Sequence, residues 1–240
     1  MRPHPFALRQ RHIYVPVSIG DPPVTGEFLL DTGASMTCVS TSFLGRVRLP
    51  IAGVRGATAH AAGGLIGHSV EGVMLPSLTV AGETRTGVQI TQVNANPLRQ
   101  QFGHAPDGVL GVNFLQHFEV ALHFPARTLT LTPSDDARDP AEWSRLEAVD
   151  VGILNAHLRD GWLFELEATL ADRVRVTTLL ELGAPRSILT GNAARALGYT
   201  PESPELRPGR TPLLGMDGRT IAPLYAPPLS LDLGPVRWPA

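Results

Sequence analysis

The segment Phe28–Ser40, with the sequence FLLDTGASMTCVS, constrains the fold more than any other part of the chain. An apolar run leads to Asp31, Thr32 and Gly33, and a second run leads away from them. This pattern predicts a carboxylate on a tight loop between two buried strands, because glycine permits a sharp turn and the close approach of another backbone. Burial among apolar neighbours is expected to perturb the pKa of Asp31. Asp-Thr-Gly also occurs by chance in ordinary turns, so the tripeptide alone assigns no function.

A second informative segment runs from Asp107 to Pro133. It begins with a glycine-punctuated apolar turn at residues 108–111, and a short helix is expected around residues 114–118. Two stretches of alternating polarity, residues 120–124 and 128–131, then predict two β-strands.

Together the two segments resemble the retropepsin-like aspartic proteases, in the form found in bacteria. In that family a DTGA loop is followed by a flap hairpin and then by a stretch of the type G-x-L-G-x-x-F-L. This chain has DTGA at residues 31–34 and GVLGVNFL at residues 108–115. Two ordered motifs are much more specific than either alone, and the resemblance covers roughly the first half of the chain. Ala34, in place of serine, favours the retroviral type over the pepsin type.

The composition agrees with an all-β protein, because many short apolar runs are broken by 24 Gly and 22 Pro. With the resemblance, it predicts a mainly β, retropepsin- or pepsin-like acid protease fold of two diverged lobes, built from β-hairpins with short helices. The formal net charge of −2 gives no reason to expect nucleic acid or an anionic membrane as a partner. No apolar run approaches the ~20 residues that span a bilayer. The histidines lack metal-ligand spacing, so we expect no metal and no cofactor.

The N-terminal sequence MRPHPFALRQRHIYVPVSIG lacks the apolar core of a signal peptide. If Met1 is the native start, we expect a cytoplasmic protein, and otherwise the location stays open. Cys38, the one cysteine, lies within a predicted strand and is expected to be a buried thiol.

The second half of the chain follows the same order of elements as the first, at an offset of 150 residues. A strand from Leu163, a turn and a strand at residues 174–180 precede the sequence ELGA at residues 181–184. The same offset pairs Ser40 with Thr190, and each is expected to cap a short helix.

These similarities predict three parts of the chain. Residues 1–133 form a lobe with the DTGA motif, residues 134–150 form a polar linker, and residues 151–240 form a diverged second lobe with ELGA in place of DTGA. The second lobe is expected to be incomplete at its C-terminus, because the counterpart of Gly108 would fall beyond Ala240.

The resemblance implies a reaction that needs two carboxyl groups sharing one proton. A second chain could supply its own Asp31 in a symmetric dimer. Alternatively, Glu181 could supply the second carboxyl within the chain, although its longer side chain shifts the carboxylate by about 1 Å. In the third alternative there is no second carboxyl, and the chain is a catalytically degenerate relative that binds peptides or acts as a scaffold. Leu182 lacks the hydroxyl that links the two loops in this family, which slightly favours the dimer.

The implied function is endopeptidase cleavage of a protein or peptide substrate by activated water. The residues implied for catalysis are Asp31, Thr32, Gly33 and, in the intrachain alternative, Glu181. The residues implied for substrate binding are Ala34 and the flap candidates Gly63, Gly64 and Leu65, with Gly63-Gly64 as the hairpin turn.

Overall fold

The computed structural model describes residues 2–47, 52–61, 64–96, 99, 103–134, 157–159, 163–210, 212–214 and 220–240. The chain divides into two compact units. Unit 1 comprises Met1–Ala137, Glu181–Pro185 and Leu214–Arg219, and unit 2 comprises Arg138–Leu180, Arg186–Leu213 and Thr220–Ala240. The ELGA loop therefore belongs to unit 1, although it lies in the second half of the chain. The predicted linker lies outside the described residues from position 135 onward, so its boundaries stay predictions.

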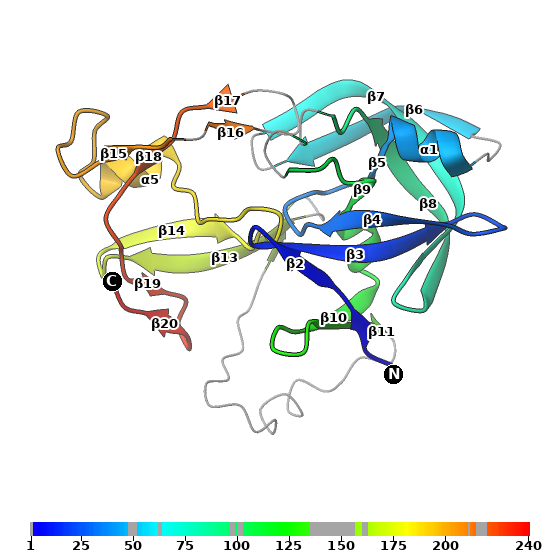
Figure 1. Cartoon of the computed structure of the whole chain (residues 1–240). Coiled ribbons are helices and arrows are strands. Elements are labelled where there is room, and N and C mark those ends of the chain that lie inside the picture. Colours follow the sequence, from blue (N-terminus) through cyan, green and yellow to red (C-terminus); the bar gives the residue numbers. More distant parts are fainter. Residues whose placement is uncertain are drawn as a thin grey trace. The chain divides into compact units, whose positions relative to one another are not determined.

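Unit 1 is built on an eight-stranded sheet with the order β2-β3-β4-β9-β5-β8-β7-β6. The strands are β2 (Ala7–Arg9), β3 (His12–Ile19), β4 (Val24–Leu30), β5 (Cys38–Ser40), β6 (Ala52–Ala61), β7 (Gly64–Val80), β8 (Glu83–Val93) and β9 (Gly108–Leu110). Strand β3 also pairs with β7, from Val17 opposite Val80 to Ile19 opposite Leu78, which closes the sheet into a barrel (Figure 1). The predicted mainly β fold is confirmed.

The two segments that the sequence singled out lie side by side in this barrel. Strand β4, which leads to Asp31, runs parallel to β9, with Phe28 opposite Gly108 and Leu30 opposite Leu110. Strand β5, which leads away from the Asp31 loop, pairs with β9 on its other side. The two strands that the loop connects, β4 and β5, therefore lie on opposite sides of β9.

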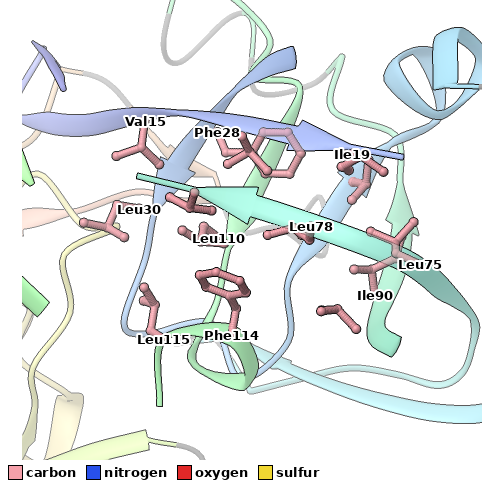
Figure 2. Packing of buried hydrophobic residues seen from close by; sticks show 14 of the residues in the cluster. Val15, Ile19, Phe28, Leu30, Leu75, Leu78, Ile90, Leu110, Phe114 and Leu115 are labelled. Atoms are coloured by element: carbon pink, nitrogen blue, oxygen red, sulfur yellow. The ribbon is translucent and has the colours of Figure 1, made fainter. Parts of the chain in front are cut away.

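The core of unit 1 consists of apolar side chains at alternating positions along these strands, and therefore on one face of each, together with side chains of the helices that follow them (Figure 2). The side chains labelled in the figure are Val15, Ile19, Phe28, Leu30, Leu75, Leu78, Ile90, Leu110, Phe114 and Leu115. All are at most 3% exposed. Because burial of one such side chain contributes about 1.5–3 kcal/mol, this core holds the ends of β4 and β9 in fixed positions.

Helices α1 (Thr41–Val47) and α3 (Val112–Leu115) flank the barrel strands in unit 1. The hydroxyl of Ser40 accepts the N–H of Phe43 at 3.1 Å, which confirms the predicted cap of α1. The helix expected around residues 114–118 lies earlier in the chain, at Val112–Leu115, and Phe118 is already the first residue of β10 (Phe118–His123). No helix in the described part of the chain is long and apolar enough to cross a membrane.

A three-stranded sheet completes unit 1, formed by β1 (His4–Pro5), β11 (Thr128–Pro133) and β10 (Phe118–His123). Strands β10 and β11 confirm the two strands expected from the alternating pattern after residue 118.

Among the residues that the structure describes, unit 2 contains a five-stranded sheet and one short helix. The strands of this sheet are β12 (His157–Arg159), β13 (Leu163–Leu170), β14 (Val174–Leu179), β19 (Leu231–Asp232) and β20 (Arg237–Trp238). Two-stranded pairs join β15 (Arg207–Pro208) to β18 (Leu224–Tyr225), and β16 (Leu213–Leu214) to β17 (Thr220–Ile221). Helix α5 (Gly191–Ala196) begins after Thr190, whose hydroxyl accepts the N–H of Ala193 at 3.2 Å. The predicted cap at Thr190 is therefore confirmed.

Candidate active site

Asp31 lies directly after β4 and is only 9% exposed. Its backbone N–H donates to the carbonyl of Leu110 on β9, at 3.1 Å. One carboxylate oxygen accepts the N–H of Gly33 at 2.7 Å. The backbone and the carboxylate of Asp31 are thus both fixed, one by the neighbouring strand and the other by the turn of its own loop.

Asn113 forms hydrogen bonds with the end of the Asp31 loop that leads into β5. The side-chain oxygen of Asn113 accepts the N–H of Thr37 at 2.7 Å and its hydroxyl at 2.8 Å, and the side-chain nitrogen donates to the carbonyl of Gln89 at 2.7 Å. The sequence motif includes Asn113, but its role was not predicted. An amide within an apolar stretch was the available signal, because a buried amide needs several partners.

The loop Glu181–Pro185 meets the Asp31 loop within unit 1. The backbone N–H of Leu182 donates to the hydroxyl of Thr32 at 3.0 Å, and the side chain of Leu182 packs against the barrel core. Leu182 lacks the hydroxyl that would make a cross-loop bond, as the sequence indicates, but its backbone N–H links the two loops instead. A leucine at this position cannot return the same bond with its side chain.

Two glycines allow the loops to approach this closely. A methyl group built on Gly183 would lie 2.2 Å from Cγ of Asp31, and one built on Gly33 would lie 2.6 Å from Cγ of Glu181. Real side chains do not come so near, so each loop presents a bare backbone to the carboxyl-bearing residue of the other. Sequence reasoning did not single out Gly183, although it stands 150 residues after Gly33.

Both carboxyl groups have displaced pKa values. Burial raises the pKa of Asp31, and the backbone of Gly33, Gly183 and Ala34 opposes this by favouring the charged form. Burial, with a smaller contribution from the charge of Asp31, raises the pKa of Glu181 to about 7. The structure thus brings together four of the predicted site residues, Asp31, Thr32, Gly33 and Glu181. Two of them carry carboxyl groups with raised pKa values.

The other predicted site residues are less closely connected to this pair. Ala34 is 8% exposed, and its carbonyl accepts the N–H of Val112 at 2.8 Å. The hairpin of β6 and β7 spans the flap candidate, but Gly63 lies outside the described residues. Gly64 pairs with Ala61 as the first residue of β7, so it belongs to the strand and not to the turn. A role for Gly63, Gly64 and Leu65 in substrate binding stays a prediction.

In the part of the chain that the structure describes, no group of three or more His, Cys, Asp or Glu side chains could hold a metal ion.

Comparisons with known proteins found a similarity in the segment that contains Asp31. Residues 15–114 match the family model described as aspartyl protease, and this segment includes Asp31 and most of the second motif. Among solved structures, a retropepsin-like aspartic protease from Rickettsia conorii matches with 14% identity and a TM-score of 0.36, over 53% of this chain and 87% of that chain. No curated protein matches the chain. The predicted resemblance to the retropepsin-like aspartic proteases is confirmed.

Proposed function

From the match of residues 15–114 to the aspartyl protease family, we propose that this protein is an aspartic endopeptidase whose carboxyl pair, Asp31 and Glu181, comes from one chain. The observation that carries the proposal is the contact of Gly183 with the carboxylate of Asp31. In a symmetric dimer the loop of a second copy would have to occupy this position. The bond from Leu182 to Thr32 joins the same two loops. Both observations favour the intrachain alternative over the dimer that the sequence slightly favoured.

The environments of the two carboxyl groups suggest their roles. Burial favours the protonated form of both groups, but at Asp31 three backbone groups oppose it and favour the charged form, whereas at Glu181 the charge of Asp31 adds to the effect of burial. In the proposed reaction Asp31 takes a proton from water, and the oxygen of that water attacks the peptide carbonyl carbon. Glu181 gives its proton to the carbonyl oxygen, which yields a neutral tetrahedral diol. Asp31 then protonates the departing amine, Glu181 recovers a proton from a hydroxyl of the diol, and the C–N bond breaks.

We also propose that the second half of the chain is a diverged copy of the first. Strands β13 and β14, the Glu181 loop and helix α5 follow β3, β4, the Asp31 loop and α1 at an offset of about 150 residues. The proposal explains why a glutamate faces Asp31 where a repeated aspartate would be expected. It also explains why Gly183 stands where Gly33 stands in the first loop.

The intrachain pair predicts that activity per chain does not depend on protein concentration. We expect a constant specific rate of peptide cleavage over about three decades of dilution, because no second chain is needed to complete the site. The measurement is the initial rate on a fluorogenic peptide library, with sedimentation velocity over the same concentrations as the control. A specific rate that falls as dimers dissociate would contradict the intrachain pair. Binding of the peptides without cleavage would favour the non-catalytic, peptide-binding alternative.

The raised pKa of Glu181 predicts how the rate depends on pH. As pH rises through about 7, Glu181 loses the proton that it must donate, so kcat/KM should fall about tenfold per pH unit. The rate should also fall in acid, because protonated Asp31 cannot accept a proton from water. The measurement is kcat/KM of the wild-type protein from pH 4 to pH 9. A rate that stays flat across the upper half of this range would contradict the role given to Glu181.

A further inference from the structure

Asp107 stands immediately before strand β9 and bonds to the strands on both sides of it. Its backbone N–H donates to the carbonyl of Glu27 on β4 at 2.9 Å, and its carbonyl accepts the N–H of Ser40, the last residue of β5, at 2.8 Å. These are the two strands that the Asp31 loop connects. One residue outside the loop therefore bonds to both of them.

The side chain of Asp107 makes two further bonds. One carboxylate oxygen accepts the backbone N–H of Glu27 at 2.9 Å, and the other accepts a guanidinium N–H of Arg46, in the last turn of α1, at 2.6 Å. Glu27 is thus bonded to Asp107 through both its N–H and its carbonyl. The two strands fit closely here, because a methyl group built on Gly26 would lie 2.9 Å from Cβ of Asp107.

The two side-chain bonds of Asp107 differ in what they hold. The ion pair with Arg46 is open to solvent, since the side chains of Arg46 and Asp107 are 55% and 28% exposed, and water and salt screen such a pair. The bond from Glu27 instead joins the backbone of β4 to the residue that begins β9. We therefore expect the bond with Glu27 to hold the two strands in register, and the ion pair to contribute little.

The register of β9 decides which carbonyl meets the backbone of Asp31. Leu30 lies opposite Leu110, and the N–H of Asp31 donates to the carbonyl of Leu110 at 3.1 Å. If β9 shifted along β4, this carbonyl would no longer face that N–H. Because a strand rises about 3.3 Å per residue, Glu27 precedes Asp31 by about 13 Å along β4. Asp107 therefore acts on Asp31 through the strands and does not touch the reacting groups.

We propose that Asp107 is a positioning residue, which sets the register of β9 against β4 and so preserves the backbone bond that fixes Asp31. The inference rests on the proposed role of Asp31, but it adds a residue outside the carboxyl pair. A carboxylate suits the position because each of its oxygens accepts from a different donor. An asparagine would turn its NH₂ group toward one of these donors.

The test compares Asp107→Ala, which removes the bond with Glu27, and Asp107→Asn, which keeps an oxygen able to accept it. Arg46→Gln is the matched control, because it removes the ion pair and leaves the bond with Glu27. The first readout is amide hydrogen exchange, followed by NMR. In Asp107→Ala the N–H of Asp31 should exchange at least about tenfold faster, whereas in Asp107→Asn and Arg46→Gln its rate should stay within about threefold of the wild type.

The amides of β3 and β7 separate positioning from a general loss of stability. These strands pair with each other, with Val17 opposite Val80, and none of the bonds of Asp107 described above involves them. A change that merely destabilised unit 1 would accelerate exchange of their amides as much as that of Asp31. Equal acceleration in all three places, or unchanged exchange of the Asp31 amide in a folded Asp107→Ala protein, would overturn the proposal.

Kinetics give a second readout. We expect kcat of Asp107→Ala to fall about tenfold with little change in KM, because a misplaced carboxyl group loses rate more than ground-state binding. Asp107→Asn should recover most of this loss, and an equal loss in both variants would contradict the role given to the bond with Glu27. Absence of cleavage in the wild type, with the exchange pattern as expected, would contradict the endopeptidase function and not the role of Asp107.

A measurement on the wild-type protein covers the case in which Asp107→Ala does not fold. The amide of Glu27 should exchange slowly and show a coupling through the hydrogen bond to the side-chain carboxyl carbon of Asp107. The amide of Asp31 should show the same kind of coupling to the carbonyl carbon of Leu110. Absence of the first coupling, with exchange of the Glu27 amide as fast as in an unstructured peptide, would overturn the proposal.

Discussion

Asp31→Asn and Glu181→Gln are each expected to lower kcat for peptide cleavage by at least about 10³-fold. Each change removes one carboxyl group at nearly constant shape, so the pair can no longer hold one acid and one base. The measurement is kcat on a fluorogenic peptide at the optimal pH, with circular dichroism to confirm that each variant is folded. The matched controls are Asp172→Asn and Glu167→Gln, the same two changes at exposed positions of unit 2, which should retain wild-type rates.

The outcomes separate the two sources of the second carboxyl. Loss of activity in both variants supports the intrachain pair. An active Glu181→Gln protein together with an inactive Asp31→Asn protein would favour a dimer that uses Asp31 twice. In that case, mixing inactive Asp31→Asn chains with wild-type chains should lower the rate by more than simple dilution, because mixed dimers would be inactive.

Glu181→Gln also gives a stability readout with a defined sign. The folded-state pKa of Glu181 is raised, so its contribution to stability is fully present below its ordinary value of 4.5 and is lost as pH rises through about 7. The free energy of unfolding of the wild type should therefore fall over this range relative to that of Glu181→Gln. Because Glu181 is partly exposed, the difference should be only on the order of 1 kcal/mol.

Gly183→Ala is expected to lower kcat by about 10²-fold or more. The added methyl group would lie 2.2 Å from Cγ of Asp31, and the loop must retreat to accommodate it. A retreat on the order of 1 Å separates Glu181 from Asp31 and misplaces the proton donor. The measurement is kcat together with the pKa of Glu181, which should fall as the charge of Asp31 becomes more distant. Gly45→Ala is the matched control, because a methyl group there meets nothing within 4 Å. A fully active Gly183→Ala protein would show that this loop does not complete the site.

Local sequence patterns predicted the individual elements well. The apolar runs on either side of Asp31 became β4 and β5, and the alternating stretches after residue 118 became β10 and β11. The helix caps at Ser40 and Thr190 also formed as expected. These features depend on neighbours within a few residues, on hydrophobic periodicity and on side-chain bonds to the nearest backbone, so they can be read from a short window.

The sequence also singled out Asp31 as the candidate for the first carboxyl group. Asp31 follows an apolar strand and lies just before a glycine. The second motif supplies the strand that pairs with the one leading to Asp31. The order of these motifs was sufficient to predict a resemblance to the aspartic proteases, and the match of residues 15–114 to the aspartyl protease model agrees with it.

Only the tertiary structure decided what faces Asp31. The sequence left three alternatives, Glu181, a second copy of Asp31 and no second carboxyl at all, and the missing hydroxyl at position 182 slightly favoured the second copy. In the structure the link is a backbone N–H, which every residue except proline possesses, and the contact depends on bare glycine backbone at positions 33 and 183. Such contacts join residues 150 positions apart and leave no periodic or compositional trace.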